Sequence, residues 1–393
     1  MEKKIFLKNN YNSISAGRNY TEAIDSEGKL YTLGNNSLNP KHIMGNRFIS
    51  VSAGVFHTVA IDRRGKLYTW GYNGHGELGD GTKKEHLTPK HITGNRFISA
   101  SAGPDHTVAI DSEGKLYTWG CNYCGELGDG TKKERLTPKH IMTETRFIYA
   151  SAGSNHTVAI DSEGKLYTWG DNSLGELGDG TRKECLIPKH IMTETRFIFI
   201  SAGSNYTVAI DSEGKLYTWG CNSCGQLGDG TRKERLAPKH IMTETRFIYA
   251  SAGRSHTVAI DRQGNLYTWG YNGYGQLGDG KTKERLNPKH IMTGTRFICV
   301  AAGYSHTVAI DNKWKLYTWG YNGFGQLGDG TTENCLKPKQ IMEGTRFGYL
   351  NKSIEQGEAN LEKKTVYSEY GLSLKNVTEE NIVAGCVEAG IPV

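Results

Sequence analysis

Short apolar runs separated by turn-forming residues recur along this chain about every 50 residues. In one copy, residues 156–160 (His-Thr-Val-Ala-Ile) and 166–169 (Leu-Tyr-Thr-Trp) are rich in the β-branched and aromatic residues typical of strands. Residues 161–164 (Asp-Ser-Glu-Gly) lie between them and end in a glycine suited to the positive φ of a tight turn. The pattern therefore predicts a β-hairpin in every copy.

Two further runs complete each copy. Pro188 opens the run 188–192, and because proline cannot donate to a ladder, this run suits an edge strand. The run 196–200 (Arg-Phe-Ile-Phe-Ile) then leads into the next Ser-Ala-Gly signature. Four short strands per copy is the number found in a β-propeller blade.

The number of copies predicts the number of blades. A repeat of about 20 to 50 residues indicates a solenoid, a propeller or an array. We expect an all-β fold, a seven-bladed β-propeller of four-stranded blades, in which each sheet buries its faces only against its two neighbours. The signature occurs seven times, ending at Gly17, Gly54, Gly103, Gly153, Gly203, Gly253 and Gly303.

The first copy is shortened, as terminal repeats often are. It lacks the glycine-rich segment that the second copy has at 76–82, and it carries Leu33 where the other six copies have tryptophan. Residues 4–14 match the segment that precedes later signatures, and the repeats stop partway through a unit at 338–347. We therefore expect the N- and C-terminal segments to share one blade and close the ring, which hides both sheet edges.

We assign residues 1–347 to the propeller and residues 348–393 to a short C-terminal extension. Within the extension, 378–389 begins with a threonine followed by two glutamates, a pattern typical of a helix start. The extension is expected to be partly helical and loosely packed, and a partner-binding segment is the alternative.

Charge and hydropathy narrow the class of protein. A net charge of +6 on 393 residues favours solubility over nucleic-acid binding. Basic pairs such as 83–84 and 132–133 recur in one loop, but a glutamate follows each pair, so a solvated rim is preferred to a nucleic-acid surface. We find no secretion signal and no run of about 18 apolar residues, and we expect an intracellular monomer, cytoplasmic or nuclear, without membrane insertion.

Groups that could carry chemistry repeat around the ring, whereas an enzyme needs one blade with a constellation that the others lack. The G-x-G-x-x-G match at 74–79 is followed by a charged loop and not by the helix of a dinucleotide site. The Cys-x-x-Cys pairs at 121–124 and 221–224 lie two blades apart, too far to share a zinc ion. The repeated histidines and tryptophans are expected to pack or hydrogen-bond within and between blades. We expect no catalytic residues, cofactor or metal.

The copies differ mainly in the residue pair after Ser-Ala-Gly and in the loop after Trp-Gly. A constant scaffold with variable loop tips is how repeat proteins diversify recognition, and tyrosine and arginine often carry interface energy. We predict a partner-binding site made by Arg18, Phe56, Asp105, Asn155, Asn205, Arg254, Tyr304, Tyr72, Tyr123, Tyr274 and Phe324.

Three linked motifs recur in the copies: Ser-Ala-Gly-x-x-His-Thr-Val-Ala-Ile-Asp, Gly-Lys-Leu-Tyr-Thr-Trp-Gly and Asn-x-x-Gly-Gln-Leu-Gly-Asp-Gly-Thr. By these motifs, residues 4–347 resemble the regulator of chromosome condensation (RCC1) repeat family. Members are seven-bladed propellers that bind other proteins; the founding member is a guanine-nucleotide exchange factor for a small nuclear GTPase, and a bacterial relative inhibits β-lactamases.

The resemblance implies a protein-interaction propeller that regulates a small Ras-like or Ran-like GTPase, at most as an exchange factor. In exchange-competent members, acidic and histidine residues just before the repeated histidine face the GTPase, and Asp105 matches that position here. The alternatives are a non-catalytic scaffold or inhibitor of another protein, and a nucleic-acid or chromatin binder that uses the basic rim.

Overall fold

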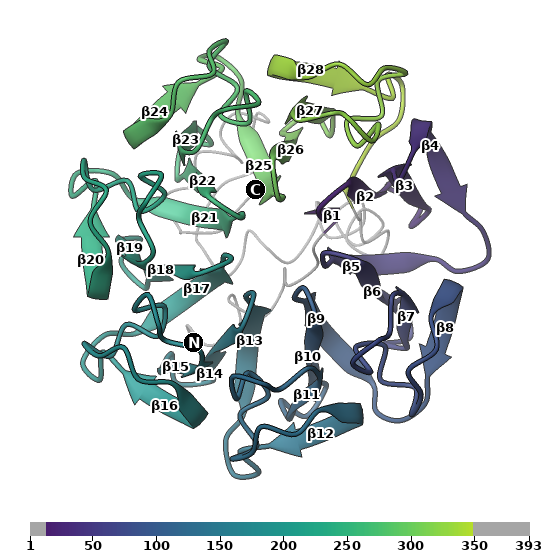
Figure 1. The fold of residues 1–393 in the computed structure, drawn as a ribbon. Helices are drawn as coiled ribbons and strands as arrows, with labels where there is room; N and C mark the ends of the chain where they lie inside the picture. The colour runs from purple at the N-terminus through teal and green to yellow at the C-terminus, as the bar shows by residue number, and fades with distance from the viewer. Residues whose placement is uncertain (1–12, 349–393) are drawn as a thin grey trace, which may run out of the picture. The chain divides into compact units, whose positions relative to one another are not determined.

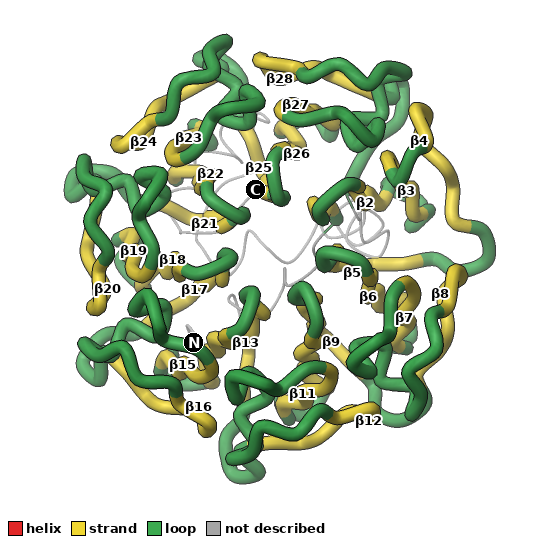
Figure 2. Tube along the Cα trace, in the orientation of Figure 1, coloured by secondary structure: helices red, strands yellow, loops and turns green. Residues whose placement is uncertain are grey.

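The computed structural model describes residues 13–348, which form a ring of seven four-stranded sheets (Figure 1). Strands that follow one another in the chain are neighbours in each sheet and pair antiparallel. Strands and connecting loops make up the whole of this part, which contains no helix (Figure 2). The predicted all-β, seven-bladed propeller is confirmed. The helix predicted at 378–389 lies outside the described residues.

Each blade takes four consecutive strands of the chain. In order, the blades comprise β1 (Ile14–Ala16), β2 (Tyr20–Ile24), β3 (Leu30–Gly34), β4 (Ser37–Ile43); β5 (Phe48–Ala53), β6 (His57–Asp62), β7 (Leu67–Gly71), β8 (His86–Ile92); β9 (Phe97–Ala102), β10 (His106–Asp111), β11 (Leu116–Gly120), β12 (Arg135–Ile141); β13 (Phe147–Ala152), β14 (His156–Asp161), β15 (Leu166–Gly170), β16 (Cys185–Ile191); β17 (Phe197–Ala202), β18 (Tyr206–Asp211), β19 (Leu216–Gly220), β20 (Arg235–Ile241); β21 (Phe247–Ala252), β22 (His256–Asp261), β23 (Leu266–Gly270), β24 (Arg285–Ile291); and β25 (Phe297–Ala302), β26 (His306–Asp311), β27 (Leu316–Gly320), β28 (Cys335–Ile341).

The position of a strand in its blade explains its sequence pattern. The first strand lies nearest the ring's axis and the fourth lies at the rim (Figure 1). The second strand is buried along its whole length, as in β10, because neighbouring blades cover both faces of the sheet, and it therefore shows no alternation of apolar and polar residues. The fourth strand, such as β12, is partly exposed and carries the proline expected of an edge.

The core lies between successive blades. In one cluster, Val108 and Leu116 of the third blade pack with Ala159 and Trp169 of the fourth, all fully buried. The repeated tryptophans therefore serve inter-blade packing, as predicted.

One backbone carbonyl in each outer loop, the connection between the third and fourth strands, joins two blades. The Glu77 carbonyl accepts hydrogen bonds from Thr107 Oγ1 and Trp119 Nε1 of the next blade, both at 2.8 Å. A carbonyl oxygen has two lone pairs, so it satisfies both buried donors. We call this group the junction carbonyl. It recurs at Glu126, Glu176, Gln226 and Gln276.

The repeated histidine extends this junction. His106 Nε2 lies 2.9 Å from Oγ1 of Thr157 in the next blade, and Thr157 donates its one hydroxyl proton to the Glu126 carbonyl. The histidine must therefore be the donor, which fixes the neutral tautomer with its proton on Nε2. Burial lowers the pKa of His106 to about 3, so the ring stays neutral at physiological pH.

The first blade contains both ends of the described chain. The short strand β1 pairs with β2, while Phe347 from the C-terminal side forms a bridge with Asp25 just beyond the other end of β2. In the third blade, by contrast, one strand, β9, makes both the pairing that β1 makes in the first blade and the pairing that Phe347 makes there. The predicted ring closure is confirmed: the first strand of this blade is assembled from the two ends, and Phe347 is fully buried.

The first blade also lacks an outer loop. Only Asn35 and Asn36 connect β3 to β4, both with positive φ, whereas residues 121–134 connect β11 to β12. The missing loop removes the acceptors that Thr32 and Thr58 would have by analogy with Thr118 and Thr107. Without another acceptor, two buried hydroxyl groups would be unsatisfied.

Glu22 supplies that acceptor. It stands where the other six blades have valine, and its side chain is 1% exposed. Thr32 Oγ1 lies 3.0 and 2.9 Å from its two carboxyl oxygens, and Thr58 Oγ1 lies 3.4 Å from one of them and 3.2 Å from the Tyr20 hydroxyl oxygen. Burial raises the pKa of Glu22 to about 8, so the carboxyl is largely protonated at neutral pH. A protonated carboxyl explains the double contact with Thr32, because each partner then contributes one proton.

Glu22→Gln should remove a pH dependence of stability. The pKa of Glu22 is raised from 4.5 in the unfolded chain to about 8 in the folded protein. The contribution of the protonated carboxyl to the free energy of unfolding is therefore fully present below pH 4.5 and is lost as the pH rises through 8. Between pH 5 and 8 the natural protein should lose about 1.4 kcal/mol of unfolding free energy per pH unit through this group, and the variant should not. The difference, variant minus natural protein, should therefore increase by that amount per pH unit. Urea denaturation at several pH values measures this, with exposed Glu113→Gln as control; a flat difference for Glu22→Gln would contradict the assignment.

His106→Tyr should weaken the acid sensitivity of the fold. The pKa of His106 falls from 6.5 in the unfolded chain to about 3, so its contribution to stability is lost as the pH drops below 6.5, by about 1.4 kcal/mol per unit. Tyrosine is accommodated here, because Tyr206 occupies the same position and donates to the His256 carbonyl at 2.6 Å.

The measurement is the unfolding free energy in urea between pH 7 and pH 4.5. His140→Gln is the matched control, since Gln340 stands at the equivalent place in the last blade. An equal acid slope in His106→Tyr and the natural protein would refute the role given to this histidine.

Candidate protein-binding face

The two variable parts of the repeat lie on the same face of the ring. The inner turn joins the first and second strands of a blade, and it is hydrogen-bonded to the start of the outer loop of that blade. For example, the Cys121 amide donates to the Asp105 carbonyl at 2.8 Å, and Tyr72 donates to Phe56 at 3.0 Å. We call the face that carries inner turns and outer loops the loop face. All eleven residues of the predicted site lie on it.

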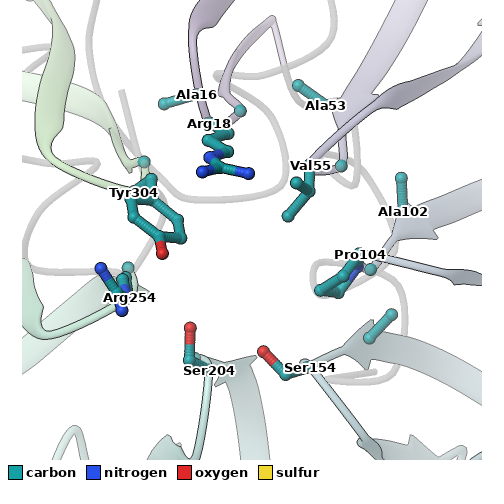
Figure 3. A pocket seen from close by; sticks show the side chains of 18 of the residues that line it. Ala16, Arg18, Ala53, Val55, Ala102, Pro104, Ser154, Ser204, Arg254 and Tyr304 are labelled. Carbon is teal, nitrogen blue, oxygen red and sulfur yellow. The ribbon is translucent and has the colours of Figure 1, made fainter. Parts of the chain in front are cut away.

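The first residues of the seven inner turns together surround the mouth of a central cavity of about 100 Å³ (Figure 3). The walls are the alanines and glycines of the repeated signature. A Cβ at Gly54 would lie 2.3 Å from the Gly103 carbonyl oxygen, so glycine is needed for adjacent turns to approach so closely. The mouth residues are Arg18, Val55, Pro104, Ser154, Ser204, Arg254 and Tyr304.

The structure separates the predicted residues by their position in the turn. Arg18, Arg254 and Tyr304 are first residues and line the mouth. Phe56, Asp105, Asn155 and Asn205 are second residues, and they do not line it. Both residues of each pair vary between copies, so sequence variation alone does not distinguish these two roles.

Five predicted residues from four blades form one arginine–aromatic cluster. Arg18 Cζ lies 5.3 Å from the ring centroid of Tyr304 and 5.4 Å from that of Phe56. Arg254 Cζ lies 4.1 Å from the Tyr304 centroid. Phe56 also meets Tyr72 edge to face at 6.2 Å. These distances are within the range of cation–π and aromatic contacts.

A second aromatic cluster covers the last two blades. Tyr274 contacts Tyr271 and Tyr321, with ring centroids 6.2 and 4.8 Å apart, and Tyr321 contacts Phe324 at 6.2 Å. Tyr271 and Tyr321 belong to the same variable loops but are not in the predicted set. Their signal was an aromatic side chain at the first loop position, shared with Tyr72.

The other predicted residues are more dispersed. Tyr123 contacts His75 of the preceding blade, with centroids 5.5 Å apart. Burial raises the pKa of the half-buried Asp105 carboxyl, and the nearby His75 opposes this effect. Asn155 and Asn205 belong to the fourth and fifth blades, across the ring from the first (Figure 1).

The outer loops are held rigidly by a buried asparagine. In the third blade the Asn122 side-chain amide donates to Asp129 Oδ1 and to the carbonyls of Thr131 and Lys133, at 2.9 to 3.1 Å. Its oxygen accepts from the Leu127 amide at 2.9 Å. The glycine-rich motif is thus a loop scaffold, and no helix follows it in the described chain.

The thiols of the Cys121–Cys124 pair are held in the unreactive protonated form. Burial raises the pKa of Cys121 to about 12 and that of Cys124 to about 11, which keeps both thiols protonated. Among residues 13–348, no three histidine, cysteine or acidic side chains are grouped to hold a metal ion.

Cations of the outer loops pair with glutamates of the next blade. Lys132 contacts Glu184 at 2.5 Å and Arg182 contacts Glu234 at 2.5 Å; equivalent pairs are Lys83 with Glu134 and Arg232 with Glu284. This pairing leaves less positive charge for a nucleic-acid backbone than the lysine and arginine pattern alone indicates. Over the described ranges, no helix has the length and hydropathy required to cross a membrane.

The blades, the closed ring and the diversified loop face define a seven-bladed repeat propeller. The family of RCC1-like domains matches residues 37–359, and the chain belongs to this family. Comparison with curated proteins gave no match.

Solved structures share the fold at low sequence identity. Human WBSCR16 is 19% identical, with a TM-score of 0.72 over 78% of this chain and 84% of that one. Yeast RCC1 (Prp20) bound to Kap60 is 22% identical, with a TM-score of 0.72 over 92% and 94%. Prp20p from Saccharomyces cerevisiae, described with its binding to Gsp1p and histones, is 21% identical, with a TM-score of 0.73 over 91% and 99%.

Proposed function

We propose that this chain captures a protein partner on its loop face, and that the partner is a small Ras-like or Ran-like GTPase on which the chain acts as an exchange factor. The observation that carries the proposal is the placement of exposed aromatic side chains. Within residues 13–348, the aromatic residues with the greatest exposure all lie on the loop face: Phe56, Tyr72, Tyr123, Tyr271 and Tyr274.

The composition of this face matches that of protein interfaces. Phe56 is 49% exposed, Tyr72 44% and Tyr123 61%, so these rings can still lose water on binding. Aromatic and arginine side chains are enriched at the centres of interfaces, where they supply most of the binding energy. Arg18 and Arg254 lie among them.

The rigidity of the face also supports binding. Inner turns and outer loops are tied together by backbone hydrogen bonds, and each complete outer loop is held by its buried asparagine. A preorganised surface loses little conformational entropy on association. Its loops therefore need not become ordered when a partner binds.

A GTPase partner is supported by the family and by Asp105. Prp20p is described as binding Gsp1p, and Asp105 matches an acidic position that faces the GTPase in exchange-competent relatives. An exchange factor needs no catalytic constellation of its own, because it shifts the GTPase toward the nucleotide-free state by binding that state more tightly. The repeated, structural character of the buried histidines is compatible with such an activity.

Combined substitution of Phe56, Asp105, Arg254 and Tyr304 by alanine should abolish partner capture without unfolding the protein. Hot-spot side chains each contribute about 2 kcal/mol or more, so we expect at least a 100-fold loss of captured partner. The assay is affinity capture from the native cell or host, followed by nucleotide release from any GTPase recovered.

The matched control is alanine at Arg64, Glu113, Glu213 and Lys313, exposed residues in turns on the opposite face. Equal capture by the loop-face variant and the natural protein would refute the binding face. Recovery of a GTPase whose nucleotide release is not accelerated would refute exchange activity and favour a scaffold or inhibitor.

A further inference from the structure

The mouth of the central cavity holds two guanidinium groups beside one tyrosine. Arg18 and Arg254 both approach the Tyr304 ring, so the distance between their Cζ atoms cannot exceed the sum of 5.3 and 4.1 Å. Both arginines are exposed and lie on the rim of the cavity mouth, with Tyr304 between them along the rim (Figure 3). Two like charges at one opening favour the binding of an anion there.

These two cations differ from the other arginines of the loop face. Arg135, Arg235 and Arg285 contact aspartates of their own loops, and Arg182 and Arg232 contact glutamates of the next blade. The ion pairs found within residues 13–348 include neither Arg18 nor Arg254. Their positive charge is therefore available to a ligand.

The size and lining of the mouth limit what can enter. A cavity of about 100 Å³ is much smaller than the roughly 300 to 1,000 Å³ of sites for drug-sized ligands, so it fits a side-chain head group and not a nucleotide. Arg254, Ser204 and Ser154 place polar groups along one part of the rim (Figure 3). Val55 and Pro104 form an apolar part.

We propose that this mouth binds the side-chain carboxylate of an acidic residue in a protein partner. Arg18 and Arg254 donate charge-assisted hydrogen bonds to the carboxylate, and the Tyr304 ring keeps both guanidinium groups in place by cation–π contact. The inference rests on the proposed function, because the acidic residue belongs to the protein that the loop face captures. The mouth then acts as the central pocket of that interface.

A carboxylate fits better than a nucleic-acid backbone. A strand of phosphates requires a groove with several unpaired cations along its length. Here the unpaired arginines meet at one narrow opening, while outer-loop cations such as Lys132 and Arg182 are paired with glutamates.

The test uses fluorescein-labelled hexa-glutamate peptide and the full chain, followed by fluorescence anisotropy at fixed ionic strength. The double variant Arg18→Gln with Arg254→Gln should bind about tenfold more weakly or worse, as expected for loss of charge-assisted hydrogen bonds. The control Arg64→Gln with Arg262→Gln makes the same change in net charge in exposed turns of the opposite face, and it should bind as the natural protein does.

A lysine pair distinguishes guanidinium recognition from simple charge. Arg18→Lys with Arg254→Lys keeps the charge but loses the planar donors, and it should bind with an affinity between those of the glutamine pair and the natural protein. Hexa-glutamine should not bind. Unchanged thermal unfolding midpoints establish that the variants are folded.

Several outcomes would overturn the inference. One is that hexa-glutamate shows no saturable binding, and another is that hexa-glutamine binds as tightly as hexa-glutamate. A third is that the mouth variant and the opposite-face variant lose the same affinity for hexa-glutamate. Tighter binding of a triphosphoserine peptide of about the same charge would replace the carboxylate with a phosphate. The assay contains no partner, so its failure is distinguishable from failure of partner capture by the loop face.

Discussion

The structure depends on the junction carbonyl of each outer loop. In the second blade, the Glu77 carbonyl accepts from Thr107 and Trp119 of the third blade, and His57 donates to the same threonine at 2.9 Å. One peptide group thus fixes an outer loop, a buried tryptophan and two neighbouring second strands. A buried carbonyl must be paired, so neither the loop nor the blade can shift without leaving polar groups unsatisfied. The rigidity of the loop face follows from the same bonds that hold the ring together.

The first blade shows what happens when this constraint is removed. Its outer loop is reduced to two asparagines, and the buried Glu22 carboxyl replaces the missing loop as the acceptor for Thr32 and, together with the Tyr20 hydroxyl, for Thr58. The indole of Trp70, whose neighbouring blade has no junction carbonyl, is 8% exposed, whereas the five tryptophans that follow are fully buried. Glu22 therefore compensates for the shortened loop, and it makes the stability of this blade fall as the pH rises from about 4.5 to about 8.

The repeat made much of the fold readable from the sequence. Seven signatures gave the number of blades, and the prolines and turn glycines located the strands, because every blade meets the same environment. The incomplete units at both ends indicated a shared blade, but not which end supplies which part. That division depends on the pairing of Phe347 with Asp25, which lie more than 300 residues apart in the chain.

The candidate site was only partly readable. Variation between copies located the loop face, because substitutions there do not disturb the junctions. It did not separate mouth residues from their neighbours, since Arg254 and Ser255 are adjacent in sequence and only the direction of the turn distinguishes them. Nor did it show that Arg18 and Arg254 meet at Tyr304, because that contact joins three blades. The role of Glu22 is not recognisable from the sequence, because one acidic residue among six valines gives no indication of burial.

The shared first blade makes the covalent starting point of the propeller arbitrary. Ile14 and Phe347 occupy one strand position, and the connections from each fourth strand to the next first strand are short and equivalent around the circle. Opening the backbone at another of these connections would preserve every sheet pairing. In topological terms the molecule is a cyclic array of seven units. Circular permutation changes which blade contains the chain ends but leaves each blade between the same two neighbouring blades.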